Sequence, residues 1–190
     1  MVNKWSKKRS VMRRYNLTAL IYDERYCEEQ EAKYKAALEG LSINNESMIL
    51  DAGCGTGLFF HSIAGQANQV VGADVSRELL LLAKKHQRKF ENVSLILADA
   101  DHLPFKQELF DFIFAFTILQ NMPNPKETLK EFKISAKAGC RFVVTGLKAV
   151  FTLEALGALA EAAELEVIAY KDYETLRCNV ITCIQKRPIQ

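Results

Sequence analysis

The chain has 190 residues, of which 49% are hydrophobic and 25% are charged, with nine glycines and four prolines. This is an ordinary globular composition, and it excludes collagenous, disordered and disulfide-scaffold proteins. The length suits one domain over residues 1–190, whose core needs no metal or disulfide support. The longest apolar runs are far shorter than the roughly 20 residues that span a bilayer, so we expect a soluble, cytoplasmic protein with no membrane contact.

Cysteine spacing bears on metal binding and on the redox environment. The five cysteines form an odd set without any C-x-x-C pair, which fits neither a zinc site nor a secreted disulfide framework. We therefore expect reduced thiols and no bound metal.

Charge is distributed unevenly along the chain. The overall formal charge is +2, but residues 1–22 hold six basic side chains and no acidic one. The remaining 19 basic and 23 acidic residues give the rest of the chain a charge of −4. Residues 1–14 therefore form a basic N-terminal arm that also contains Trp5. Such an arm is able to neutralise phosphates and stack on bases, although a solvated tail is the alternative interpretation.

The predicted elements begin with a helical cap over residues 15–46. Its stretch 17–41 reads as one or two helices packed over the carboxyl edge of a sheet. From residue 47 onward, buried strand-like runs alternate with helical patterns. Strands are predicted at 48–52, 70–75, 93–98, 111–116, 141–147, 166–170 and 179–185. Helices are predicted at 58–65, 77–90 and 125–137, and from the N-cap Thr152 to about residue 165.

Alternation of strands and helices predicts an α/β fold for residues 47–190. Such βαβ units build a parallel sheet with helices on both faces. The last two strands have no helix between them, so we expect that pair to be antiparallel.

The strongest local motif is the loop that follows the first strand. It reads Asp51-Ala52-Gly53-Cys54-Gly55-Thr56-Gly57 and lies at a strand-to-helix turn. Glycines there permit positive φ angles and allow a ligand to approach the backbone. The D-x-G-x-G-x-G spacing differs from the G-x-G-x-x-G of dinucleotide enzymes, and no G-K-[ST] follows as in a P-loop.

Two further acids follow the next two strands. Asp74 closes the second strand, where a carboxylate is able to accept hydrogen bonds from both hydroxyls of a ribose. Asp99 closes the third strand, where a carboxylate is able to accept a hydrogen bond from the exocyclic amine of an adenine. Either acid alone could be a simple strand-end cap, but three successive strand-end acids around a glycine loop favour a nucleoside site.

This combination resembles the class I S-adenosylmethionine-dependent methyltransferases over residues 47–148, and the ubiquinone-biosynthesis-like branch in particular. The glycine loop, Asp74 and the pair Asp99-Ala100 match the family's cofactor motifs. Residues 103–105 with Phe110-Asp111 resemble its entry to the fourth strand, whereas residues 137–140 lack the usual proline. The resemblance implies a Rossmann-like sheet of order 3-2-1-4-5-7-6 with the seventh strand antiparallel.

The resemblance also implies which residues form the site. S-adenosylmethionine, with S-adenosylhomocysteine as product, would lie over the carboxyl ends of the first four strands. The residues expected to bind it are Asp51, Gly53, Cys54, Gly55, Gly57, Asp74, Val75, Asp99, Ala100 and Phe116. The residues expected to line the acceptor pocket are Tyr22, Tyr26, Thr117, Gln120 and Asn121, with Tyr15 able to close it. No catalytic base is identified.

The methyl acceptor is the open question at this stage. We expect RNA or a translation-related substrate, reached through the basic arm. The alternatives are a small-molecule acceptor and a non-catalytic S-adenosylmethionine-binding scaffold, with a nicotinamide-dependent oxidoreductase a distant third. A protein activator or a homodimer is left open.

Overall fold

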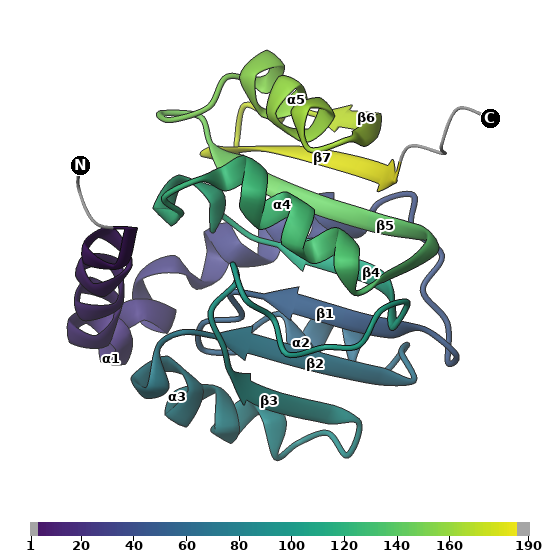
Figure 1. Cartoon of the computed structure of the whole chain (residues 1–190). Coiled ribbons are helices and arrows are strands. Elements are labelled where there is room, and N and C mark those ends of the chain that lie inside the picture. The colour runs from purple at the N-terminus through teal and green to yellow at the C-terminus, as the bar shows by residue number, and fades with distance from the viewer. Residues whose placement is uncertain (1–3, 186–190) are drawn as a thin grey trace.

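The computed structural model describes residues 4–185, apart from the side chains of residue 4 and of residues 18–28. Its centre is a seven-stranded sheet of order β3-β2-β1-β4-β5-β7-β6 (Figure 1). The strands are β1 (Met48–Ala52), β2 (Gln69–Asp74), β3 (Val93–Leu97), β4 (Phe110–Ala115), β5 (Ala136–Leu147), β6 (Leu165–Lys171) and β7 (Cys178–Gln185). The predicted strand order is therefore confirmed.

Strands β3, β2, β1, β4 and β5 pair in parallel, β6 runs in the same direction, and only β7 runs against its neighbours. Both β5 and β6 pair with β7 in antiparallel register. A short turn region joins β6 to β7, with no helix between them, as the sequence predicts. The carboxyl ends of β1 to β5 consequently meet at one edge of the sheet, where the loops after β1, β2, β3 and β4 converge.

Helices cover both faces of the sheet (Figure 1). They are α1 (Lys4–Leu38), α2 (Phe60–Ile63), α3 (Arg77–Gln87), α4 (Pro125–Ile134) and α5 (Leu153–Ala162), with a 3-10 turn η1 (Leu119–Asn121). One apolar core lies between the sheet and α4 with α5, and includes the buried Phe132 and Leu156. The other lies against α2, α3 and the C-terminal part of α1, and includes Tyr34 and Phe59.

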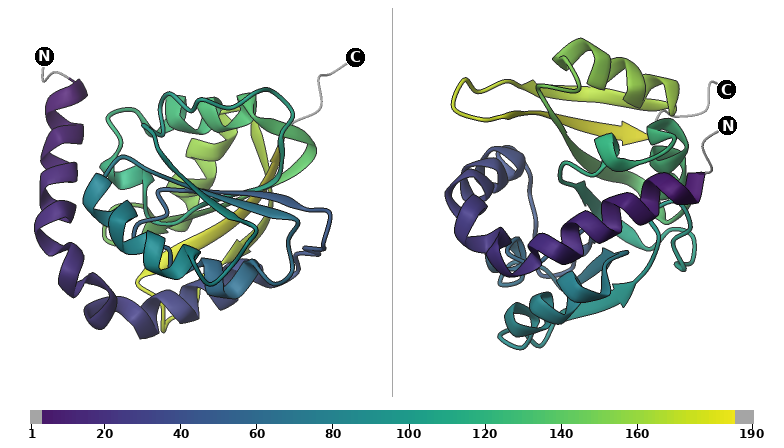
Figure 2. Two further views of the ribbon diagram at one scale, coloured as in Figure 1. Left: turned by 90° about the horizontal axis from the view of Figure 1, so that it is seen from below. Right: turned by 90° about the vertical axis from the view of Figure 1, so that its left-hand side faces the viewer.

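Helix α1 unites the segments expected as a basic arm and a helical cap. It runs without a break for 35 residues, so the chain is helical from Lys4 through residues 14 and 15. Its N-terminal half crosses the carboxyl edge of the sheet and its C-terminal half turns onto one face (Figure 2). Lys171 closes the C-terminal end by donating to the carbonyls of Ala36 and Glu39, where the helix dipole favours a cation. Despite the length of α1, no helix within residues 4–185 is long and apolar enough to cross a membrane.

Two element boundaries differ from the sequence prediction for identifiable reasons. Helix α2 has four residues rather than eight, because i to i−3 hydrogen bonds from Phe60 to Gly57 and from His61 to Leu58 close the turns before it in place of helical i to i−4 bonds. The Asn92 side chain then donates to the carbonyls of Ala64 and Ala67 just beyond α2. Strand β5 starts five residues early, since Ala136 pairs with Phe110 ahead of a register shift.

Candidate functional site

The loop after β1 has the backbone conformation that its glycines predict. Gly53, Gly55 and Gly57 have φ angles of +78°, +56° and +80°. The N–H groups of Gly53 and Cys54 both donate to the carbonyl of Ala73 at the end of β2, which fixes the loop to the sheet. A Cβ on Gly55 would meet nothing within 4 Å, so the backbone there borders open space. This is the cradle that a ligand approaching the backbone requires.

Asp74 holds the next loop in place from the end of β2. Its Oδ2 accepts the Gly55 N–H at 2.9 Å, and its Oδ1 accepts the Ser76 N–H at 2.8 Å. Burial raises the pKa of Asp74, while hydrogen bonds from Ser76, Gly55 and Val75 act in the opposite direction. Because each carboxylate oxygen has two lone pairs, Asp74 retains acceptor capacity for hydroxyl groups.

Asp51 lies beneath the loop, 1% exposed. Its Oδ1 is buried and has no hydrogen-bond partner among the described residues. Burial, with a smaller contribution from Asp74, raises the pKa of Asp51 to about 8. A buried carboxyl without a partner is costly, so this atom is suited to a donor that the protein itself does not supply.

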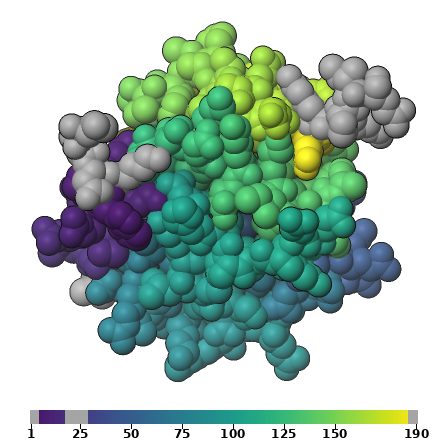
Figure 3. Space-filling view, viewed as in Figure 1, coloured from purple at the N-terminus to yellow at the C-terminus, as the bar shows by residue number. Residues whose placement is uncertain are grey.

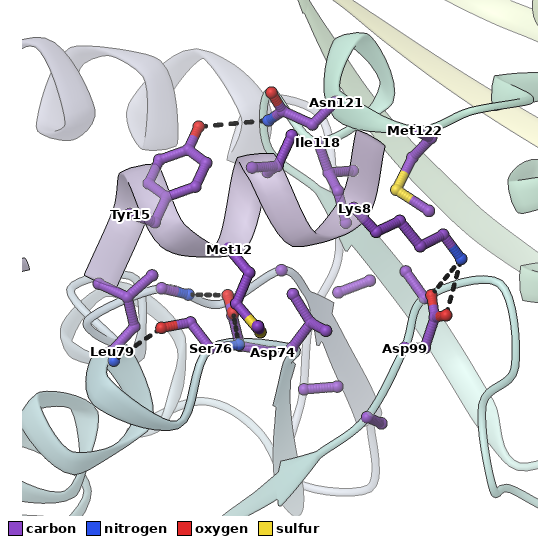
Figure 4. A pocket seen from close by; sticks show the side chains of 18 of the residues that line it. Lys8, Met12, Tyr15, Asp74, Ser76, Leu79, Asp99, Ile118, Asn121 and Met122 are labelled. Carbon is purple, nitrogen blue, oxygen red and sulfur yellow. Dashed lines mark hydrogen bonds and ion pairs between the residues drawn. The ribbon is translucent and has the colours of Figure 1, made fainter. Parts of the chain in front are cut away.

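The loop after β3 presents two carboxylates to one lysine of α1. Lys8 Nζ contacts both oxygens of Asp99 at 2.7 Å and Asp101 Oδ2 at 2.6 Å. Thr128 of α4 donates to the other oxygen of Asp101 at 2.5 Å. Asp99 and Lys8 are therefore side by side at the cavity (Figure 4), an ion pair that no local sequence pattern indicates.

The segment after β4 forms the remaining wall. Thr117 has a φ of +49°, which is rare for a residue that is not glycine, and its N–H donates to Thr145 Oγ1. Asn121 Nδ2 donates to Tyr15 Oη at 3.2 Å, and Asn121 Oδ1 accepts from Arg14 at 2.9 Å. The bonded pair of Tyr15 and Asn121 joins α1 to this wall (Figure 4).

These elements enclose one cavity, which we call the glycine-loop cavity. Its walls come from the loops after β1 to β4, and its roof comes from α1 (Figure 4). In the space-filling view the purple N-terminal helix lies directly against the teal and green surface (Figure 3). The residues expected from the sequence that line it are Gly53, Gly55, Asp74, Val75, Asp99, Ala100, Phe116, Thr117, Asn121 and Tyr15.

The other expected residues are placed differently. Asp51, Cys54 and Gly57 lie in or under the loop but do not line the cavity, and neither does Gln120. Gln120 nevertheless has a buried Oε1 without a partner among the described residues. The side chains of Tyr22 and Tyr26 lie outside the described residues, so their predicted role stays a prediction.

Sequence reasoning missed the contribution of α1 to the roof. Lys8, Val11, Met12 and Tyr15 line the cavity from one side. Their i, i+3, i+4, i+7 spacing places them on one helix face, and this spacing is the sequence pattern that could have indicated the roof. The other lining residues that the sequence did not indicate are Ala52, Ala73, Ser76, Leu79, Ala98, Leu103, Ile118 and Met122.

The family follows from comparison with known proteins. A family model described as a methyltransferase domain matches residues 43–183. This range is most of the chain and contains all seven strands except the last two residues of β7. The chain belongs to the class I S-adenosylmethionine-dependent methyltransferases.

Among the relatives, a demethylmenaquinone methyltransferase of Staphylococcus saprophyticus is 30% identical, covering 59% of this chain and 49% of its own length. A malonyl-[acyl-carrier protein] O-methyltransferase of Hamiltonella defensa is 34% identical, covering 63% of this chain and 42% of its own length. The chain thus spans about half the length of the curated relatives it matches. A methyltransferase chain solved in complex with the Haloferax volcanii Trm112 methyltransferase activator has a TM-score of 0.80, with 15% identity and coverage of 90% and 95%, a likeness of fold.

The residues present fit the family's cofactor. The open space beside Gly55 accommodates a ligand against the backbone, and the buried Oδ1 of Asp51, in the strand that leads into the loop, has no partner among the described residues. Asp74 would hold the ribose hydroxyls, and Asp99 would hold the adenine amine. When bound, S-adenosylmethionine supplies an electrophilic methyl group on its sulfonium. The protein's own task is then to bind, orient and exclude water.

Proposed function

We propose that this protein transfers a methyl group from S-adenosylmethionine to a small-molecule acceptor bound beneath α1. The choice of acceptor is based on one observation: several basic side chains of α1 form bonds within the molecule. Lys7 donates to the Met122 carbonyl at 2.6 Å, Lys8 to Asp99 and Arg14 to Asn121. Three of the six cations that suggested an RNA-binding arm are therefore bonded within the molecule.

The relatives support the same acceptor class. Their names specify demethylmenaquinone and a malonyl group on a carrier protein as acceptors. These names favour the small-molecule alternative over the RNA acceptor expected from the sequence.

Methyl transfer requires the site mainly to orient the acceptor toward the methyl donor. Met12, Ile118 and Met122 give the cavity apolar walls, and Tyr15 with Asn121 gives it polar groups. Holding an acceptor atom in line with a methyl donor is able to supply about 7–11 kcal/mol of the barrier. A roof helix pinned at several points suits this task, because it fixes the acceptor side while limiting water access.

Radiolabelled transfer tests the proposal. The protein is incubated with methyl-labelled S-adenosylmethionine and a cell extract separated into RNA, protein and small-molecule fractions. We expect the label in the small-molecule fraction, and its loss with the variant Asp74→Ala but not with Asp172→Asn, an exposed carboxylate paired with Lys148. Label released from acid-insoluble material by ribonuclease would restore the RNA acceptor.

Two further results would change the proposal. Binding of S-adenosylhomocysteine without transfer to any fraction would favour the scaffold alternative. Transfer only when the protein fraction is added back would point to an activator subunit, as in the Haloferax volcanii complex.

A further inference from the structure

Lys8 separates two cavities and contacts a carboxylate in each. It lines the glycine-loop cavity together with Asp99. It also lines a neighbouring groove together with Asp101, His102 and the exposed Trp5. The three charged side chains are only 10–17% exposed, so their mutual contacts are largely shielded from water. One ammonium thus bridges two fixed anions at the boundary of the candidate cofactor site.

The two carboxylates differ in how they are held. Asp101 Oδ1 accepts a hydrogen bond from Thr128, a fully buried residue of α4. Asp101 Oδ2 forms an ion pair with Lys8. Asp99 accepts Lys8 on both oxygens and the Asp101 N–H on Oδ1. Lone-pair capacity therefore remains on Asp99 Oδ2, the oxygen whose described donor is Lys8.

We propose that Lys8 and Asp101 position the roof of the adenine-binding end of the glycine-loop cavity. The 6-amino group of adenine replaces Lys8 as the hydrogen-bond donor to Asp99 Oδ2. Lys8 keeps its bond to Asp101, and α1 therefore stays in place over the ligand. This inference rests on the proposed use of S-adenosylmethionine. It adds a role for Asp101, which belongs to none of the motifs quoted from the sequence, and a cofactor-site role for Lys8 of the expected basic arm.

The electrostatics explain why the second carboxylate is needed. Burial by itself lowers the pKa of Lys8, but hydrogen bonds to Asp101 and Asp99 outweigh it and the pKa is raised. Lys8 consequently stays charged and requires an anionic partner. Without Asp101, adenine and Lys8 would compete for Asp99 Oδ2, and binding the nucleoside would break the Lys8 contact that helps to hold α1 over the cavity.

The first experiment needs no variant. Binding of S-adenosylhomocysteine is measured by calorimetry, and hydrogen exchange of the α1 amides over residues 7–15 is followed with and without it. We expect these amides to remain as protected or to become more protected in the complex. Loss of their protection on binding would overturn the inference while leaving the proposed function intact. Absence of any binding to the wild-type protein would overturn both.

Two substitutions then test the roles of Asp101 and Lys8. The variant Asp101→Asn keeps an oxygen for Thr128 but removes the charge that faces Lys8. We expect its affinity for S-adenosylhomocysteine to fall about tenfold, with α1 losing protection on binding, because a charged hydrogen bond is lost. Adding Lys8→Met to that variant removes the competitor and should restore affinity to within about threefold of Lys8→Met alone.

The control is Arg9→Met, which removes an exposed cation from the same turn of α1 and should leave affinity unchanged. Equal affinity of Asp101→Asn and wild type, with α1 protected in both complexes, would exclude a role for Asp101. If affinity in the double variant stays tenfold below that of Lys8→Met, competition by Lys8 is also excluded.

Discussion

The backbone N–H of Gly55 donates a hydrogen bond of 2.9 Å to Oδ2 of Asp74, and this bond joins the glycine loop to the end of β2. The two residues are neighbours because β1 and β2 are paired in parallel, with Ala52 opposite Ala73. One acid thereby shapes the loop and offers acceptors at the cavity. Its substitution should affect ligand binding through both routes.

Asp74→Ala should weaken S-adenosylhomocysteine binding about 100-fold. It removes a carboxylate that holds Gly55 and Ser76, and each hydrogen bond to a charged group is worth about 1.5–3 kcal/mol. Asp74→Asn keeps one acceptor oxygen and should cost about tenfold. Calorimetric titration measures both, with Asp172→Asn as the control. Unchanged affinity in Asp74→Ala would show that the ligand does not use the end of β2.

The strand-end acids could be found from the sequence because each belongs to a local pattern. Asp51, Asp74 and Asp99 each close a short apolar run, and parallel strands bring such ends to one edge. The alternation of strands with helices likewise predicts the sheet. These features depend on periodicity within about ten residues.

The roof could not be found in the same way. Lys8 and Asp99 are 91 positions apart, and basic residues near an N-terminus are equally typical of a solvated tail. The pairing depends on α1 continuing through residues 14 and 15 and bending across the sheet edge, which is set by tertiary packing. The same holds for Thr128, whose bond to Asp101 joins α4 to the loop after β3.

Gly57→Ala should destabilise the fold by about 2–5 kcal/mol. The residue has a φ of +80°, and an added Cβ would lie 2.4 Å from Cε2 of the buried Phe60. The left-handed conformation costs about 1–2 kcal/mol, and the overpacking costs about 1–3 kcal/mol. Urea denaturation measures the change in the free energy of unfolding. Gly65→Ala is the matched control, since its Cβ would meet nothing within 4 Å, and a loss as large as that of Gly57→Ala would refute the packing argument.

Asp51 should make the stability of the ligand-free protein fall as the pH rises. Burial raises its folded-state pKa from 3.8 to about 8, so the folded state binds more protons than the unfolded state between these values. The free energy of unfolding should then decrease by up to about 1.4 kcal/mol per pH unit in that window, and the effect is absent below pH 3.8. Thermal unfolding from pH 5 to 8 tests this against Asp51→Asn, which should lack that component. Parallel profiles for the two proteins would mean that Asp51 is ionised at no cost.

Deletion of residues 1–14 should weaken binding of S-adenosylhomocysteine and leave RNA binding unaltered. The deletion removes Lys8, Val11 and Met12 from the roof, together with the bond from Lys7 to the Met122 carbonyl. We expect at least a tenfold loss of affinity by calorimetry. The matched variant Arg9→Gln with Arg13→Gln removes two exposed cations of the same helix and should bind the ligand like wild type. Filter binding of total RNA across a salt series completes the test, because phosphate contacts would give a salt-dependent affinity that falls in both variants. Such a fall, with ligand binding intact after the deletion, would make the N-terminal half of α1 an RNA-binding segment rather than a roof.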